Sequence, residues 1–405
     1  MTVASGQRNI GTTRSLVLPI YVPSVLLSIA TSALLPLAPS LATMLGTSLP
    51  VAGLIAGAPL IGQGIATLPA GWLSGRFGDR PVMIAAAIAA VGGTSGAALA
   101  NSSITLGISL LILGFSVALY SISRHAYVTV HANPAIRARS LSLLGATMRV
   151  GAVVGPLAGA GLGTAMQSNA APLAVAAAAA FAGLCVQAIF TPRDAVARHE
   201  RAGAAEQSVW SSLTAERGLL LRVAGTASIV SAVRAARTIL VPLVAVVIGL
   251  TGTQTLLVVG VAAAFDLSLF YVGGRLMDRH GALAAGIPSI LGLGLGMVAL
   301  TVVVTPVWFA IVAILLGIAN GIGSGFLLTV ASDLVPQHRP GPLIGAFRFV
   351  SDSGAMLTPF VISGLAAAAS VAVVSGAFGV MGVVGALLSA RVIRRALAAR
   401  KQADR

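Results

Sequence analysis

Seven charged residues lie deep inside long apolar stretches of the chain, where a charge costs about 2.5–3.5 kcal/mol if the surroundings are hydrocarbon. Two are acids, Asp266 and Asp352, and the other five are arginines: Arg124, Arg149, Arg234, Arg237 and Arg348. A buried acid can bind and release a proton, and a buried guanidinium can pair with that acid or hold an anion. These residue types therefore predict ion pairing, proton transfer or the binding of a charged solute.

Asp266 is the stronger candidate for proton transfer. Asp352 has Arg348 one helical turn before it, and a neighbouring guanidinium stabilises the ionised carboxylate. Asp266 has no basic residue within four positions, so we expect it to be the principal proton carrier, with Asp352 second. The alternative is that Arg234 or Arg237 from the preceding apolar stretch pairs with Asp266 and keeps it ionised.

Three neutral polar residues, Gln63, Tyr120 and Asn320, are also deep in apolar stretches, where they can contact a substrate or join helices by hydrogen bonds. The sequence shows no nucleophile and base at catalytic spacing and no phosphate-binding glycine loop. Its single cysteine, Cys185, excludes a cysteine-based metal cluster. We expect neither an enzyme nor a bound metal or cofactor.

The elements that position these residues follow from composition. Of the 405 residues, 57% are hydrophobic and 9% are charged, whereas ordinary soluble domains contain roughly 25% charged residues. Apolar runs of about 20 residues are long enough to cross a bilayer as helices, and no short alternating segments of a β-barrel are present. The sequence predicts an all-α polytopic membrane protein with twelve spans, at 16–41, 49–74, 81–100, 104–130, 140–163, 172–190, 223–250, 255–277, 282–304, 307–334, 343–366 and 371–388.

The distribution of Lys and Arg predicts the orientation of the chain. Twenty of the 25 basic residues lie in the two termini and the even-numbered connections, and the odd-numbered connections hold no charged residue. By the positive-inside rule, both termini are expected in the cytoplasm and the protein in the inner (plasma) membrane. This asymmetry accounts for the net charge of +15, so we expect no nucleic-acid partner.

The polar stretch at 191–222 divides the spans into two groups of six. We predict an N-terminal six-helix bundle at 1–190, a cytoplasmic linker at 191–222 and a C-terminal six-helix bundle at 223–405. A short surface helix around Trp210 is an alternative to a plain linker.

The two halves repeat at a shift of 203 positions. The shift aligns Gly57 with Gly260, Gly114 with Gly317, Pro156 with Pro359, and the pattern Gly-x-Leu-x-x-Arg-x-Gly at 71–78 with the same pattern at 274–281. Because each repeat holds six spans, the halves are expected to be related by a two-fold axis along the membrane normal, with a cleft between them. The shift also aligns Arg149 with Asp352, which suggests a pair across that cleft.

The repeated pattern resembles the signature of the major facilitator superfamily of secondary transporters, and the resemblance covers essentially the whole chain. Gly75 stands where the family usually has Asp, whereas the second copy has Asp278. The resemblance implies a gate at the cytoplasmic side, and the residues that match the signature are Gly71, Arg76, Gly78, Gly274, Asp278, Arg279 and Gly281.

A second motif lies in the span 140–163, where Gly151, Gly155, Pro156 and Gly159 are similar to the glycine-proline motif of exporters that exchange substrate for protons. Its other interpretation is a packing seam of small residues.

The leading hypothesis is a monomeric, proton-coupled exporter (antiporter) of a small molecule that works by alternating access. The excess of deep arginines favours a neutral or anionic amphipathic substrate. The alternatives are a facilitator or importer with structural charges, and a membrane sensor or scaffold without transport. The sequence does not identify the substrate.

Overall fold

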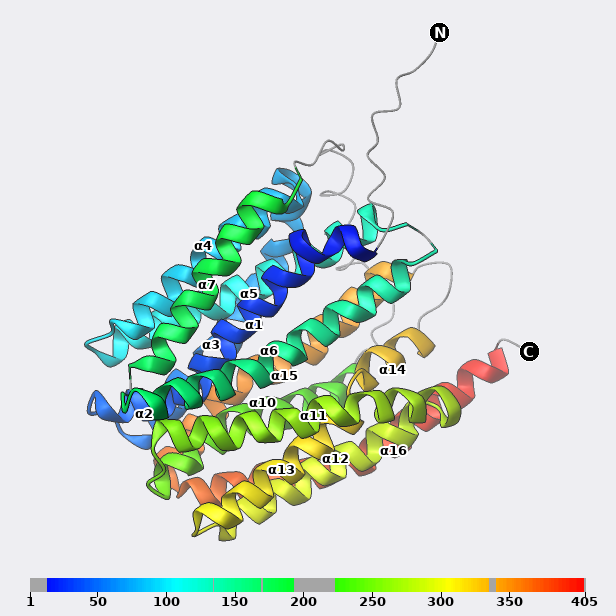
Figure 1. Cartoon of the computed structure of the whole chain (residues 1–405). Helices are drawn as coiled ribbons and strands as arrows, with labels where there is room; N and C mark the ends of the chain where they lie inside the picture. The colour runs from blue at the N-terminus through cyan, green and yellow to red at the C-terminus, as the bar shows by residue number, and fades with distance from the viewer. Residues whose placement is uncertain (1–12, 134, 169, 193–222, 335–339, 404–405) are drawn as a thin grey trace.

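The computed structural model describes residues 13–133, 135–168, 170–192, 223–334 and 340–403, and every element in these ranges is helical. Long helices are expected where apolar runs cross a membrane, because every backbone N–H must find a partner within the segment. The elements are η1 Thr13–Leu16, η2 Val17–Tyr21, α1 Val22–Leu34, η3 Leu35–Leu37, α2 Ala38–Met44, α3 Leu49–Phe77, α4 Asp79–Ala98, α5 Ser103–His131, α6 Arg137–Ala165, α7 Ala171–Phe190, α10 Gly225–Val247, α11 Gly252–His280, α12 Ala282–Ala299, η5 Leu300–Val302, α13 Pro306–Ile322, α14 Phe326–Leu334, α15 Pro340–Ala368 and α16 Val371–Ala403 (Figure 1).

Twelve helical segments in the described ranges are long and apolar enough to cross a membrane, which confirms the predicted fold class and span count. Two predicted spans are interrupted, and one is much longer than predicted. The first span, Val17–Met44, is divided by the 3-10 turn η3, where Pro36 cannot donate a backbone hydrogen bond. The tenth span is interrupted between α13 and α14, and α16 continues to Ala403 instead of ending at 388.

The helices form two groups that pack mostly within themselves. We call α1 to α7 the first bundle and α10 to α16 the second bundle. They meet mainly along two seams, one between α3 and α15 and one between α6 and α11 (Figure 1). The linker predicted at 191–222 and its possible surface helix lie almost wholly outside the described residues.

The internal repeat is present in the local geometry. Gly78 and Gly281 end α3 and α11 with φ of 90° and 84°, a left-handed conformation that favours glycine. A Cβ at Gly114 would overlap the carbonyl oxygen of Pro59, and a Cβ at Gly317 would overlap that of Ala262, which is also 203 positions after Pro59. Glycine at these paired positions therefore sets the close packing of equivalent helices in both bundles.

The two seams are also related by the repeat. A Cβ at Gly57 of α3 would overlap the ring of Pro359 of α15, and a Cβ at Gly260 of α11 would lie 2.7 Å from the Leu157 side chain of α6. Farther along the second seam, Gly163 faces Thr253 in the same manner. These contacts lie in the helix halves that lead to the odd-numbered connections, so the bundles are closely packed at that end.

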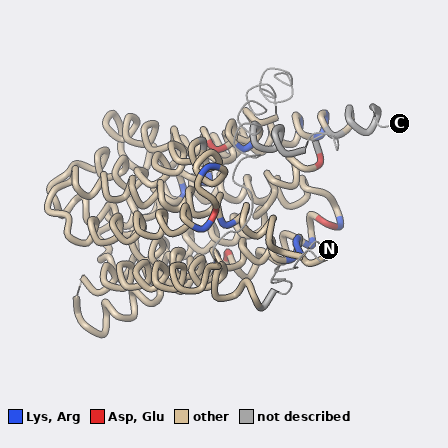
Figure 2. Tube along the Cα trace, turned by 90° about the horizontal axis from the view of Figure 1, so that it is seen from above, with Lys and Arg blue, Asp and Glu red and all other residues tan. Residues whose placement is uncertain are grey.

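Charge distinguishes the two ends of the molecule. The beginning of η1 and the end of α16 lie at one end (Figure 1). Among the described residues, Figure 2 shows the charged ones at this end and in the middle of the molecule, with none at the opposite end. We call these the charged end and the charge-free end.

Candidate functional site

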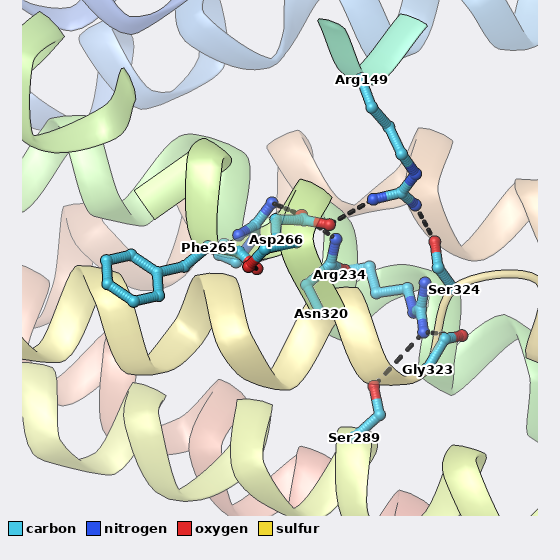
Figure 3. Close-up of polar contacts among 10 residues, drawn as sticks. Arg149, Arg234, Phe265, Asp266, Ser289, Asn320, Gly323 and Ser324 are labelled. Carbon is cyan, nitrogen blue, oxygen red and sulfur yellow. Dashed lines mark hydrogen bonds and ion pairs between the residues drawn. The ribbon is translucent and has the colours of Figure 1, made fainter. Parts of the chain in front are cut away.

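Asp266 is the centre of a polar cluster in the middle of the protein. It is 8% exposed on α11, and it accepts a hydrogen bond from Asn320 of α13, with Nδ2 2.6 Å from Oδ2. Arg149, from α6 of the first bundle, forms an ion pair with Oδ1 (Figure 3), and Arg237 of α10 lies 3.6 Å from Oδ2. The two oxygens of one carboxylate are thus held by arginines from opposite bundles.

Arg149 makes two further contacts with the second bundle. Its Nη2 donates a hydrogen bond to the Ser324 hydroxyl, between α13 and α14 (Figure 3). Its guanidinium carbon lies 4.5 Å from the centroid of the Phe270 ring, within the range of a cation–π interaction. One side chain of the first bundle therefore connects to α11 and to the interruption in the tenth span.

Arg234 supports that interruption. Its Nη2 donates to the Gly323 carbonyl at 2.7 Å and lies 3.5 Å from the Ser289 hydroxyl (Figure 3). Gly325 has φ of +88°, so the helix cannot continue through it. A cation at the carbonyl end of α13 is favourable because this end of a helix carries partial negative charge.

The cluster has an excess of positive charge. Three arginines, Arg149, Arg234 and Arg237, surround one acid, Asp266, which gives a net charge of +2 when the acid is ionised. Uncompensated charge away from water is costly, and an anionic group would reduce that cost.

A cavity of about 220 Å³ lies beside the cluster, between the bundles. Three charged residues line it, Arg149, Arg237 and Asp266, together with the hydroxyls of Ser32 and Thr238. The other lining residues are apolar: Leu35, Pro36, Ala152, Pro156, Val241, Pro242, Val259, Ala262, Ala263, Ala313 and Leu316. A cavity with one charged side and apolar walls is suited to a small amphipathic molecule.

The structure brings together five of the residues predicted for the site: Asp266, Arg149, Arg234, Arg237 and Asn320. Asp352 and Arg348 are separate from them. Both are exposed on α15, and among the described residues no hydrogen bond or ion pair within 4 Å joins either to a partner. The pair suggested between Arg149 and Asp352 is replaced by Arg149 with Asp266, because α6 packs against α11.

Tyr120 and Gln63 do not line the cavity. Tyr120 is 2% exposed and donates a hydrogen bond to Gln187 of α7 at 2.9 Å, so it joins two helices inside the first bundle. Gln63 is half-buried on α3.

Arg124 is buried in the first bundle, at 3% exposure, and lies 5.9 Å from the centroid of the Tyr120 ring. Within the described residues, its Nε and Nη1 have no hydrogen-bond partner. It is therefore not part of the Asp266 cluster, although it is the most buried of the five deep arginines.

The residues of the expected gate are at the charged end. Arg76 is exposed and lies 5.4 Å from the Trp72 ring centroid, and Asp278 and Arg279 are exposed at the end of α11. No ion pair within 4 Å links these three residues in the described part of the chain. A bridge between them stays a prediction for another conformational state.

The motif in α6 contributes close packing. A Cβ at Gly151 would overlap Ser28, and one at Gly155 would lie 2.6 Å from the Ile29 carbonyl oxygen, so these glycines set the contact between α6 and α1. Pro156 lines the cavity, and Gly159 faces Leu256 across the α6–α11 seam. The packing interpretation of this motif is therefore realised next to the cavity.

Sequence reasoning omitted Ser324 and Phe270 as site residues. A usable signal for the first was the run Gly321-Ile-Gly-Ser-Gly325 inside an otherwise helical span, which predicts a break. Phe270 had no such signal, because an aromatic side chain in an apolar span can face lipid, the protein core or a cavity. Thr238 lies four positions after Arg234, so helical spacing places the two on one face. No group of three or more His, Cys, Asp or Glu in the described ranges is arranged to hold a metal ion.

Comparison with known proteins gives a family match. The Major Facilitator Superfamily model matches residues 21–359. No curated protein sequence matches the chain.

Several solved structures are similar in fold. The inward open xylose transporter XylE from E. coli has 16% identity and a TM-score of 0.72, covering 94% of this chain and 96% of that one. The peptide transporter POT in complex with sulfate has 13% identity and a TM-score of 0.72, covering 95% of each chain. The human organic anion transporter MFSD10 (TETRAN) has 18% identity and a TM-score of 0.68, covering 93% of this chain and 99% of that one. At these identities the structures show a shared fold.

Proposed function

The chain belongs to the major facilitator superfamily and is a multi-pass secondary transporter, and we propose that it exports a small neutral or anionic amphipathic molecule by proton-coupled antiport. The observation that carries this proposal is the ion pair between Asp266 and Arg149, which joins the two bundles beside the cavity. Arg149 and Arg237 stabilise ionised Asp266 while the bundles are joined, so proton uptake is favoured when these contacts are lost. The proton in turn removes one charge of the Asp266–Arg149 pair and weakens the link between the bundles. Protonation of Asp266 is thereby coupled to the relative position of the two bundles, as alternating access requires.

Exchange of substrate for protons requires that the two exclude one another. A neutral substrate that donates a hydrogen bond to ionised Asp266 meets this condition, because a proton on the carboxylate removes the acceptor charge. The resemblance of the α6 motif to that of exporters supports the outward direction.

An anionic substrate favours a second candidate, in which substrate and proton move in the same direction. Such a substrate needs Arg149 and Arg237, which ionised Asp266 holds. Protonation of Asp266 would free them, so proton and anion would bind together.

The orientation proposed for the transporter places the charged end, with both termini, in the cytoplasm of a cell whose inner (plasma) membrane holds the protein. The proposed transporter is a monomer with 1–190 and 223–405 as its two bundles, and residues of both bundles line the cavity. In a background without Cys185, a label that cannot cross the membrane is expected to reach Leu99→Cys and not Arg391→Cys in intact cells. Leu99 is 82% exposed at the charge-free end, so the opposite labelling pattern would reverse the orientation.

The transport proposal is tested with purified protein in proteoliposomes that contain a pH-sensitive dye. A panel of neutral and anionic amphipathic compounds is added to one side, and proton movement is recorded under gradients of either sign. We expect at least one compound to move protons with the wild type and not with Asp266→Asn. Arg275→Gln is the control, because Arg275 is exposed on the same helix and lies 4.4 Å from the Tyr271 ring centroid, away from the cavity. Compound-driven proton movement that persists in Asp266→Asn would contradict proton coupling through this residue.

A further inference from the structure

We propose that Arg149 and Arg237 form a binding site for a single anionic group, such as a sulfonate or carboxylate, of an amphipathic ligand, and that Asp266 occupies this site when the ligand is absent. The inference rests on the second candidate under the proposed function, in which proton and anion move in the same direction, because it assigns a ligand class to the transport cavity. It also fixes the sign of the coupling between this ligand and the proton.

The carboxylate of Asp266 already occupies the proposed anion site. The carboxylate of Asp266 is bracketed by the two guanidiniums, with Oδ1 paired to Arg149 and Oδ2 3.6 Å from Arg237. Both arginine side chains are about one-fifth exposed, at 20% and 21%, and both line the cavity. A planar guanidinium binds two-oxygen anions well, so the donors that hold Asp266 are suited to a ligand anion that enters from the cavity.

Charge balance favours a second anion. Arg234 is directed to the Gly323 carbonyl, which is neutral, so it adds positive charge to the cluster without neutralising any of it. With Asp266 ionised the cluster has one negative charge and three positive charges. A ligand anion would be attracted even before it displaces Asp266, and it would be bound more completely afterwards.

The apolar wall of the cavity predicts that the ligand also has an apolar part. Leu35, Val241, Pro242 and Leu316 present apolar surface to the same space that Arg149 and Arg237 border. Burial of apolar ligand area against this wall contributes roughly 25 cal/mol per Å². We therefore expect an organic anion with a compact apolar body to bind better than an inorganic anion of the same charge.

Protonation of Asp266 and binding of the anion favour each other. The charged groups that face Asp266 are Arg149 on α6 and Arg234 and Arg237 on α10, and α13 contributes only the neutral Asn320. Ionised Asp266 competes with the ligand for Arg149 and Arg237, and a proton ends the competition. By linkage, protonation of Asp266 raises the affinity for the ligand, and bound ligand raises the affinity of Asp266 for a proton by the same factor.

The probes are benzenesulfonate, which keeps its charge across the working pH range, and benzenesulfonamide, its neutral counterpart. Binding to the purified full-length protein is measured by titration calorimetry at pH 5.5 and pH 8. We expect benzenesulfonate to bind the wild type more tightly at pH 5.5 than at pH 8, and Asp266→Asn to bind it tightly and equally at both values. Arg237→Gln should weaken binding by about tenfold or more, the size expected for one hydrogen bond to a charged group. Arg237→Lys should restore part of the loss.

The control for net charge is Arg275→Gln, which removes one positive charge at an exposed position and should leave the affinity unchanged. Sulfate that binds as tightly as benzenesulfonate would refute the amphipathic ligand class. Equal binding of benzenesulfonamide, absence of benzenesulfonate binding in both wild type and Asp266→Asn, or an unchanged pH dependence in Asp266→Asn would overturn the anion site. These binding measurements need no membrane. If binding follows the predicted pattern but no compound is transported in proteoliposomes, the proposed function is refuted and the anion site stands. Proton exchange with neutral compounds alone would refute only the anion site.

Discussion

Replacement of Arg149 by Gln is expected to loosen the closed charge-free end. Arg149 links the first bundle to Asp266 and Ser324 of the second bundle while both seams are packed. A hydrogen bond to a charged group contributes about 1.5–3 kcal/mol, and partial exposure of the pair, at 20% and 11% for the two side chains, reduces the gain through solvent screening. A loss of about 2 kcal/mol corresponds to a change of about 30-fold in the ratio of closed to open molecules.

The assay is pulsed electron paramagnetic resonance, which measures the distance between spin labels on the two bundles at the charge-free end. Spin labels are attached at Leu99→Cys and Val304→Cys in a background without Cys185, since these positions are 82% and 77% exposed in connections of opposite bundles. The wild type should give mainly one distance, and Arg149→Gln should add a longer one. The double variant Arg149→Gln with Asp266→Asn should add little to the larger single effect, because both changes remove the same pair.

Two results would refute this reasoning. An unchanged distance distribution in Arg149→Gln would mean that the ion pair persists equally in both states and does not hold the end closed. Strictly additive effects of the two substitutions would mean that each residue acts through a different contact.

Three further outcomes are expected. Gly114→Val should lower the thermal unfolding temperature, because the new side chain would overlap the backbone of α3 at a cost of about 1–3 kcal/mol. Tryptophan fluorescence on heating measures this temperature, and an unchanged value would contradict the packing argument. Tyr120→Phe should cost about 1 kcal/mol of stability through loss of the bond to Gln187 and leave proton movement in proteoliposomes intact, whereas loss of transport at full stability would return Tyr120 to the substrate path. Asp278→Asn should favour molecules open at the charged end, as reported by spin labels across that end; if the distances stay the same, Asp278 serves topology alone.

The twelve spans and the internal repeat could be predicted because they depend on features that are local in sequence. A span needs about twenty apolar residues wherever it packs. The glycines aligned by the shift of 203 occur where a helix ends or another backbone approaches, as at Gly78 and Gly114, so their spacing carries structural information directly.

The surroundings of Asp266 could not be predicted in the same way. Its basic neighbours come from α6 and α10, and Arg149 is 117 positions away in the chain. The absence of a basic residue on its own helix therefore says little about its charge environment, and the alternative pairing with Arg237 is the one present, together with Arg149. Tyr120 illustrates a related limit, since sequence indicates its depth and, in a helix apolar on all sides, does not indicate the direction in which it points.

The interruption between α13 and α14 makes the two halves mechanically unequal. Position 122, which corresponds to Gly325 by the repeat, lies inside the continuous helix α5. The second bundle thus contains a helix break beside Arg234 and Ser324, where its counterpart in the first bundle is a continuous helix. Bending at that break would move α14 without carrying α13 along. Opening and closing of the charged end therefore need not follow rigid rotation of equal halves.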